Sequence, residues 1–207
     1  MPKISQSDRI AKRKKNLQNL SDQLTANGYT RSDLIVSAKT ANTYATLSVL
    51  PFITVYAVAF GLIVGWRSYT DVDFGLLGIS ILLSLVIHEL IHGFFFSLFA
   101  EGKFRSVEFG VLWKSFNPYC YCGDPVRKTQ YLIALTMPGI ILGALVGAIA
   151  IAVGSATWLI FSLVAFLSAS GDFLIALKIL IFGKRGNGGL FQDHPDQPGV
   201  VVFTKEQ

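Results

Sequence analysis

The sequence predicts an all-α membrane protein with four transmembrane helices. Of its 207 residues, 52% are hydrophobic and only 15% are charged, whereas soluble domains carry about a quarter charged residues. The apolar residues gather in four runs that each reach the roughly 20 residues needed to cross a bilayer. These runs lie near residues 44–66, 74–99, 131–153 and 156–182. A soluble core in so small a protein could not bury this many apolar side chains.

The charged residues between these runs predict how the chain is oriented. Residues 1–42 hold eight Lys or Arg against three Asp, and residues 100–130 hold five against three acidic residues. The turn at 154–155 has no charge. Positive loops stay on the cytoplasmic side, so we expect both termini and the 100–130 loop in the cytoplasm of a multi-pass cell-membrane protein. The predicted partner of the basic block at 12–15 is the lipid bilayer, and no motif supports binding to nucleic acid.

The chain divides into three predicted segments. They are a basic cytoplasmic N-terminal segment at 1–42, a transmembrane domain at 43–182 and a cytoplasmic C-terminal tail at 183–207. Within the first segment, residues 5–26 are expected to form an amphipathic helix that ends at Gly28. A second short helix is expected to begin at Ser32 and to merge into the first span.

The loop after the second span has a different pattern. Residues 103–113 alternate polar and apolar side chains about two by two, which predicts one or two short surface strands. Cys120 and Cys122 follow, and in the cytoplasm they would stay reduced. Free thiols, a two-thiolate metal site and a redox pair all remain open for them. The third span carries Gly139, Gly143 and Gly147, a stripe of small residues that predicts close helix packing.

The second apolar run contains the motif His88-Glu89-Leu90-Ile91-His92. On a helix this spacing puts two imidazoles on one face, where both can bind one zinc ion, and the glutamate between them can act on a water molecule. Ionisable groups inside a bilayer are rare, costly and usually functional. The motif therefore predicts His88 and His92 as metal ligands and Glu89 as the catalytic base. A packed histidine pair and a non-catalytic metal site are the alternatives.

A catalytic zinc usually takes three protein ligands, and the chain offers few candidates for the third. Asp172 is the only other acidic residue inside a predicted span. It precedes the end of its span by about as many residues as His88 precedes the end of its own, so both lie roughly 15 Å below the same boundary at ~1.5 Å per residue. Asp172 is thus the expected third ligand. A purely structural carboxylate, or His194 as the ligand instead, remain alternatives.

These residues resemble a known pattern. The motif at 88–93, the segment Asn117-Pro-Tyr-Cys-Tyr-Cys122, the residues Ser170-Gly171-Asp172 and the triplet Asp193-His194-Pro195 are similar to the family of small bacterial membrane proteins called putative zincin peptidases. The layout also resembles that of the intramembrane site-2 metalloproteases. The resemblance covers about residues 80–200. It implies a Zn²⁺ ion held by His88, His92 and Asp172, with Glu89 as the base. The residues next to Asp172 depart from the site-2 pattern, which leaves the group that stabilises the oxyanion unassigned.

Together these observations predict an intramembrane zinc metalloprotease. Its expected substrate is a membrane-embedded or membrane-associated peptide, which would have to unwind before cleavage because a helix hides its carbonyl groups. The alternative is a non-catalytic zinc-binding scaffold. A metal or proton transporter would usually have more spans and internal repeats, and the sequence has neither.

Overall fold

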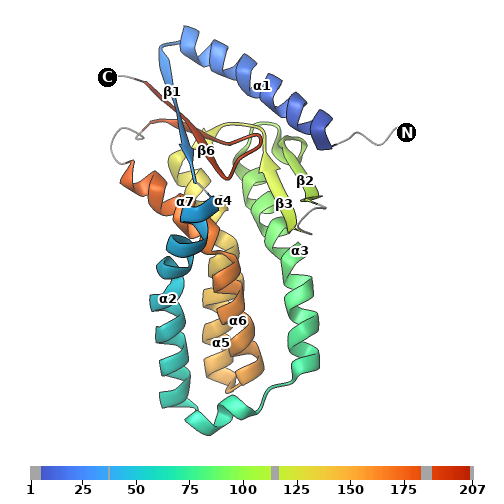
Figure 1. Cartoon of the computed structure of the whole chain (residues 1–207), viewed down its shortest axis with the longest axis vertical. Helices are drawn as coiled ribbons and strands as arrows, with labels where there is room; N and C mark the ends of the chain where they lie inside the picture. The colour runs from blue at the N-terminus through green and yellow to red at the C-terminus, as the bar shows by residue number, and fades with distance from the viewer. Residues whose placement is uncertain (1–5, 37, 113–116, 183–187, 206–207) are drawn as a thin grey trace, which may run out of the picture.

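The computed structural model describes residues 6–36, 38–112, 117–182 and 188–205. Residue 5 of the predicted N-terminal helix and residue 113 of the predicted strand segment lie outside these ranges. Helices build an elongated bundle, and small sheets and one long helix cover a single end of it (Figure 1). The helices are α1 (Gln6–Ala26), α2 (Ala38–Ile63), α3 (Phe74–Phe99), α4 (Lys128–Pro138), α5 (Val146–Val153), α6 (Ala156–Ser168) and α7 (Ser170–Ile181).

Within the described residues, two helices are long and apolar enough to cross a membrane, Phe74–Phe99 and Lys128–Val153. The first is α3, and the second is α4 continued through the π-helix η3 (Gly139–Leu145) into α5. Helices α6 and α7 make a third only if they are counted as one broken span, since they meet at a 48° bend. The described apolar part of α2, Leu47–Ile63, is shorter. The part of the chain that the structure describes therefore has two or three membrane-length helices, and the predicted number of four is not shown.

The glycine stripe of the third predicted span packs within the chain, as predicted. A Cβ atom on Gly139 would lie 2.6 Å from the ring of Phe173 in α7, and one on Gly147 would lie 2.6 Å from Tyr56 in α2. A Cβ atom on Gly143 would lie 3.0 Å from the ring of Phe166 in α6. The stripe therefore lets aromatic rings of three other helices approach one helix backbone.

The protein is mostly helical, as predicted, but it is not strictly all-α, because a four-stranded antiparallel sheet caps the bundle. Its strand order is β1-β6-β5-β4, and its strands are β1 (Tyr29–Ile35), β4 (Val126–Arg127), β5 (Leu190–Asp193) and β6 (Gly199–Lys205). The predicted second helix from Ser32 is also wrong, since Ser32 lies in β1 opposite Val202. Residues from both predicted cytoplasmic segments, 1–42 and 183–207, thus join in one sheet.

Strand β6 is buried on both faces, which explains its continuous apolar run. Val200 and Val202 pack toward the helices in the same cluster as Phe191. Val201 and Phe203 pack on the opposite face against Leu17 of α1. The apolar side of α1 therefore contacts the sheet. Its predicted helical structure and amphipathic character are confirmed, and Gly28 lies just beyond its end with a φ of +81°.

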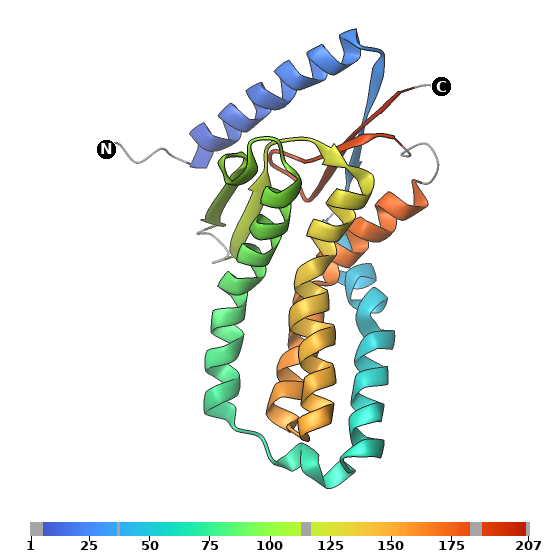
Figure 2. The same cartoon turned by 180° about the vertical axis from the view of Figure 1, so that it is seen from behind.

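A second, two-stranded sheet lies beside the end of α3. Strand β2 (Val107–Leu112), preceded by the short helix η2 (Lys103–Ser106), pairs antiparallel with β3 (Asn117–Cys122). One predicted surface strand is thus confirmed as β2, whereas its partner β3 lies beyond the predicted segment; the hairpin of the two strands is seen from behind in Figure 2. A Cβ atom on Gly93 would lie 2.1 Å from the ring of Phe109. The glycine after His92 therefore allows the hairpin to rest on the helix that carries the histidines.

Arg13 fastens α1 to this hairpin. Its guanidinium group donates two hydrogen bonds to Glu108, at 3.0 and 2.8 Å, and one to the Tyr119 hydroxyl at 3.2 Å. It also lies 4.1 Å from the centroid of the Tyr121 ring. The Arg13 side chain is 8% exposed, so its charge is satisfied by these contacts.

Replacing Arg13 by Ala is expected to loosen α1. A hydrogen bond to a charged group typically contributes about 1.5–3 kcal/mol. Because Glu108 is partly exposed to solvent, the lower part of this range applies, and the free energy that docks α1 on the hairpin should fall by about 1–3 kcal/mol. The measurement is the rate of limited proteolysis within α1. Arg9→Ala is the matched control, because Arg9 is exposed on the same helix and its loss should leave the rate unchanged. Equal rates for both variants would contradict the fastening role.

Candidate metal centre

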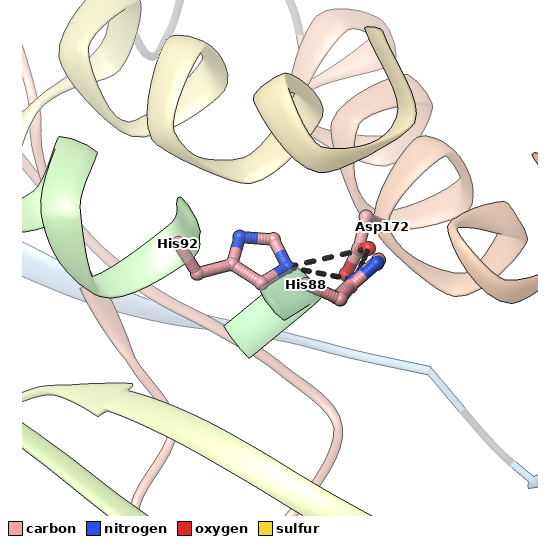
Figure 3. A group of neighbouring side chains, drawn as sticks. All are labelled: His88, His92 and Asp172. Atoms are coloured by element: carbon pink, nitrogen blue, oxygen red, sulfur yellow. Dashed lines mark hydrogen bonds and ion pairs between the residues drawn. The ribbon is translucent and has the colours of Figure 1, made fainter. Parts of the chain in front are cut away.

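Side chains from two helices converge where the bundle meets the hairpin. His88 and His92 of α3 and Asp172 of α7 place one ligand atom each within 4.8 Å of one another. The Nε2 atoms of the two histidines lie 3.2 Å apart, and Oδ2 of Asp172 lies 3.1 Å from His88 Nε2 and 3.4 Å from His92 Nε2. Figure 3 shows the three side chains pointing toward one another. The residues predicted as metal ligands therefore come together in space.

The local structure explains this convergence. Residues four apart share one face of a helix, and both histidines are buried on the inner face of α3. Asp172 lies in the first turn of α7, just after the bend at Ala169 that separates α7 from α6. The small residues at 168–171 favour such a break, and it points the carboxylate across the bundle toward α3.

The imidazole of His92 is held in one orientation. Its Nδ1 lies 2.9 Å from the carbonyl oxygen of Ala134 in α4. A carbonyl can only accept a hydrogen bond, so Nδ1 carries a proton, and Nε2, which faces His88 and Asp172, is the nitrogen available to a metal ion. Metal-binding histidines characteristically donate their other N–H in this way.

This donor set fits zinc. Zinc takes imidazole nitrogen at about 2.0–2.1 Å and carboxylate oxygen at similar distances in a tetrahedron, which separates neighbouring ligand atoms by about 3.3 Å. The three separations in the structure, 3.1, 3.2 and 3.4 Å, lie close to this value. Two neutral imidazoles and one carboxylate are also a usual ligand set of catalytic zinc.

Glu89 follows the first histidine and is half-buried. It lines the same cavity as the three converging side chains, which has a volume of about 490 Å³. The carboxylate interacts with the backbone N–H of Cys120 in β3. The predicted base is thus beside the candidate metal centre, with its carboxylate directed at the hairpin and separate from the ligand group.

His194 is not one of the converging ligands but lines the same cavity from the segment between β5 and β6. Its Nδ1 accepts a hydrogen bond from the backbone N–H of Gln197 at 3.1 Å, and its own backbone N–H donates to the carbonyl of Gly199 at 3.1 Å. Burial lowers the pKa of His194 below its usual range, which favours the neutral imidazole at pH 7. These contacts hold the loop together.

Cys120 and Cys122 lie on β3 without a disulfide. Burial raises the pKa of both thiols, to about 12 for Cys122. A metal binds the thiolate and not the thiol. Burial therefore favours the protonated form of both thiols. Cys120 lines the cavity, and in the described part of the chain neither cysteine belongs to the group of converging ligand atoms.

Much of the cavity lining is not predicted from the sequence as part of the site. Examples are Tyr131 of α4, Asp193 at the end of β5 and Ile10 of α1. Tyr131 and Ile10 carry no local pattern that would mark them. Asp193 belongs to the triplet at 193–195 that the family resemblance includes, but without the sheet its position could not be inferred.

Comparison with protein families identifies the region that contains the candidate centre. A family model described as "Putative zincin peptidase" covers residues 81–185 of this chain. The matched segment includes His88, Glu89, His92 and Asp172 and extends from within α3 to beyond the end of α7. No curated protein and no solved structure matches the chain.

Proposed function

Because the chain belongs to the family described as "Putative zincin peptidase", we propose that it is a zinc metallopeptidase that cleaves a peptide within or beside a membrane. The observation that carries this proposal is the convergence of His88, His92 and Asp172 next to Glu89 inside one cavity. Ionisable side chains on an apolar, membrane-length helix are costly in free energy, and those that occur there usually have a function.

His88, His92 and Asp172 would hold the ion. Zinc in such a site polarises the scissile carbonyl and acidifies a water molecule. The hydrogen bond from His92 to Ala134 keeps the imidazole aimed at the centre. Glu89 would accept the proton of the attacking water and pass it to the leaving amine, which is the role of a general base followed by a general acid.

We propose that the chain crosses the cell membrane four times, with α2 as the first span and the broken pair α6–α7 as the fourth. The proposal is supported by the position of α1 and both sheets at one end of the bundle (Figure 1). By the distribution of Lys and Arg this end faces the cytoplasm. The cavity is lined by elements of the same end, so water and an unwound peptide segment would enter from that side.

The proposed function is tested by removing the metal. The purified chain, in detergent or nanodiscs, is expected to hold close to one zinc per molecule by elemental analysis. It should cleave members of a transmembrane-peptide library, lose this activity with a chelator and recover it with added zinc. Bound zinc without any cleavage would favour the scaffold alternative, and a chain without zinc would refute the proposal.

A further inference from the structure

Asp193 connects two elements that flank the candidate metal centre. One carboxylate oxygen accepts a hydrogen bond from the Tyr131 hydroxyl at 2.5 Å. The other accepts a hydrogen bond from the backbone N–H of Cys122 at 2.7 Å. Asp193 lines the same cavity as Glu89 but is not one of the three converging ligands. It lies in β5, outside the segment that the family model matches.

The first connection leads to His92. Tyr131 is fully buried in α4, and its ring packs against Phe96, one turn beyond His92 on α3. Ala134 follows Tyr131 by three residues on α4, so the two lie on the same side of that helix. The carbonyl of Ala134 accepts the hydrogen bond that orients the His92 ring. Anchoring Tyr131 therefore anchors the helical turn that sets the direction of His92 Nε2.

The second connection leads to Glu89. Strand β3 pairs with β2 along one edge, and N–H groups two residues apart along a strand point to the same side. The N–H of Cys122 binds Asp193, and the N–H of Cys120 interacts with Glu89. Asp193 thus fixes the same edge of β3 whose Cys120 N–H contacts the carboxylate of Glu89.

We propose that Asp193 is a positioning residue of the metal centre, which orients His92 through Tyr131 and α4 and Glu89 through strand β3. The inference rests on the proposed function, since it assigns Asp193 to the same centre. A carboxylate suits this place because its two oxygens accept the two hydrogen bonds separately. An asparagine has only one acceptor oxygen, and its amide would oppose one of the two donors.

The test compares Asp193→Asn with the wild-type chain by zinc affinity, measured in competition with a chelator. Groups that orient a metal ligand through hydrogen bonds typically contribute 10–100-fold to metal affinity or activity, and we expect a loss in this range. The visible spectrum of the cobalt-substituted protein should also change, because it reports ligand geometry. Asp22→Asn is the matched control, since Asp22 is exposed on α1 and distant from the centre. It should leave both readouts unchanged.

Tyr131→Phe keeps the proposal testable if Asp193→Asn folds poorly, because it removes a single hydroxyl. It should weaken zinc binding less than Asp193→Asn, and the double variant should bind no more weakly than Asp193→Asn alone, since Tyr131 is one of the routes through which Asp193 acts. Unchanged zinc affinity and an unchanged cobalt spectrum in both single variants would overturn the inference while leaving the proposed function intact. A wild-type chain that binds no zinc would overturn both.

Discussion

Replacing Glu89 by Gln is expected to reduce peptide cleavage by about 10²–10⁴-fold, the contribution typical of a positioned general base. Glutamine fills the same volume and can still accept the contact from the Cys120 N–H, but it cannot take a proton from water. Glu89 is not one of the converging ligands, so zinc content should stay at the wild-type level. The measurements are the cleavage rate and the zinc stoichiometry of the same purified sample.

Glu101→Gln is the matched control for this experiment. Glu101 is exposed just beyond α3, so the same chemical change there should leave both quantities unaltered. If Glu89→Gln kept full activity, proton transfer would have to be assigned to another group. Loss of zinc together with loss of cleavage would instead show that Glu89 supports the metal, and the scaffold alternative would gain.

Removing the Asp172 carboxylate should have the second large effect, a loss of zinc affinity of at least ~100-fold. Losing a group that only orients a ligand already costs about 10–100-fold, and Asp172 would bind the metal directly. We expect Asp172→Ala to purify with little zinc and Asp172→Asn to retain a weakened site through its amide oxygen. Elemental analysis and chelator competition measure both.

Asp71→Asn serves as the control, because Asp71 is exposed and follows η1 (Trp66–Thr70) in the connection between α2 and α3, outside the group of converging ligands. Unchanged stoichiometry in both Asp172 variants would remove Asp172 from the site. The neighbouring histidines would then need a different third ligand, and the fit of the three separations to a tetrahedron would be coincidental.

The candidate site could be predicted from the sequence because its signal is local. His88 and His92 are spaced by one helical turn, and Asp172 stands out because a carboxylate inside an apolar run is costly. The similar depth of His88 and Asp172 along their helices predicts that the three side chains meet. In the structure one ligand atom of each residue lies within 4.8 Å of the other two. Their role in binding a metal remains a prediction.

The sheet could not be predicted, for a physical reason. Strands β1 and β6 are far apart in the sequence, and each alone is a short segment without strict alternation. Val201 and Phe203 are buried only because α1 covers the outer face, and Val200 and Val202 only because helices cover the other. A strand buried on both faces has no polar side to mark its period. The bend at Ala169 likewise depends on packing between helices, so it could not be inferred from the apolar run at 156–182.

The central place of β6 in the capping sheet governs the order in which the molecule can be completed. Strand β1 is made early during synthesis, yet its partner β6 follows every predicted span. Segments whose partners are close in the sequence can fold as soon as they are synthesised. Pairing β1 with β6, by contrast, closes a loop that contains the whole helical bundle. In the proposed four-span topology, the helices would therefore insert before the sheet closes. Since Asp193 lies in that sheet, its hydrogen bonds with Tyr131 and Cys122 would form only once the helices that hold His88, His92 and Asp172 are in place.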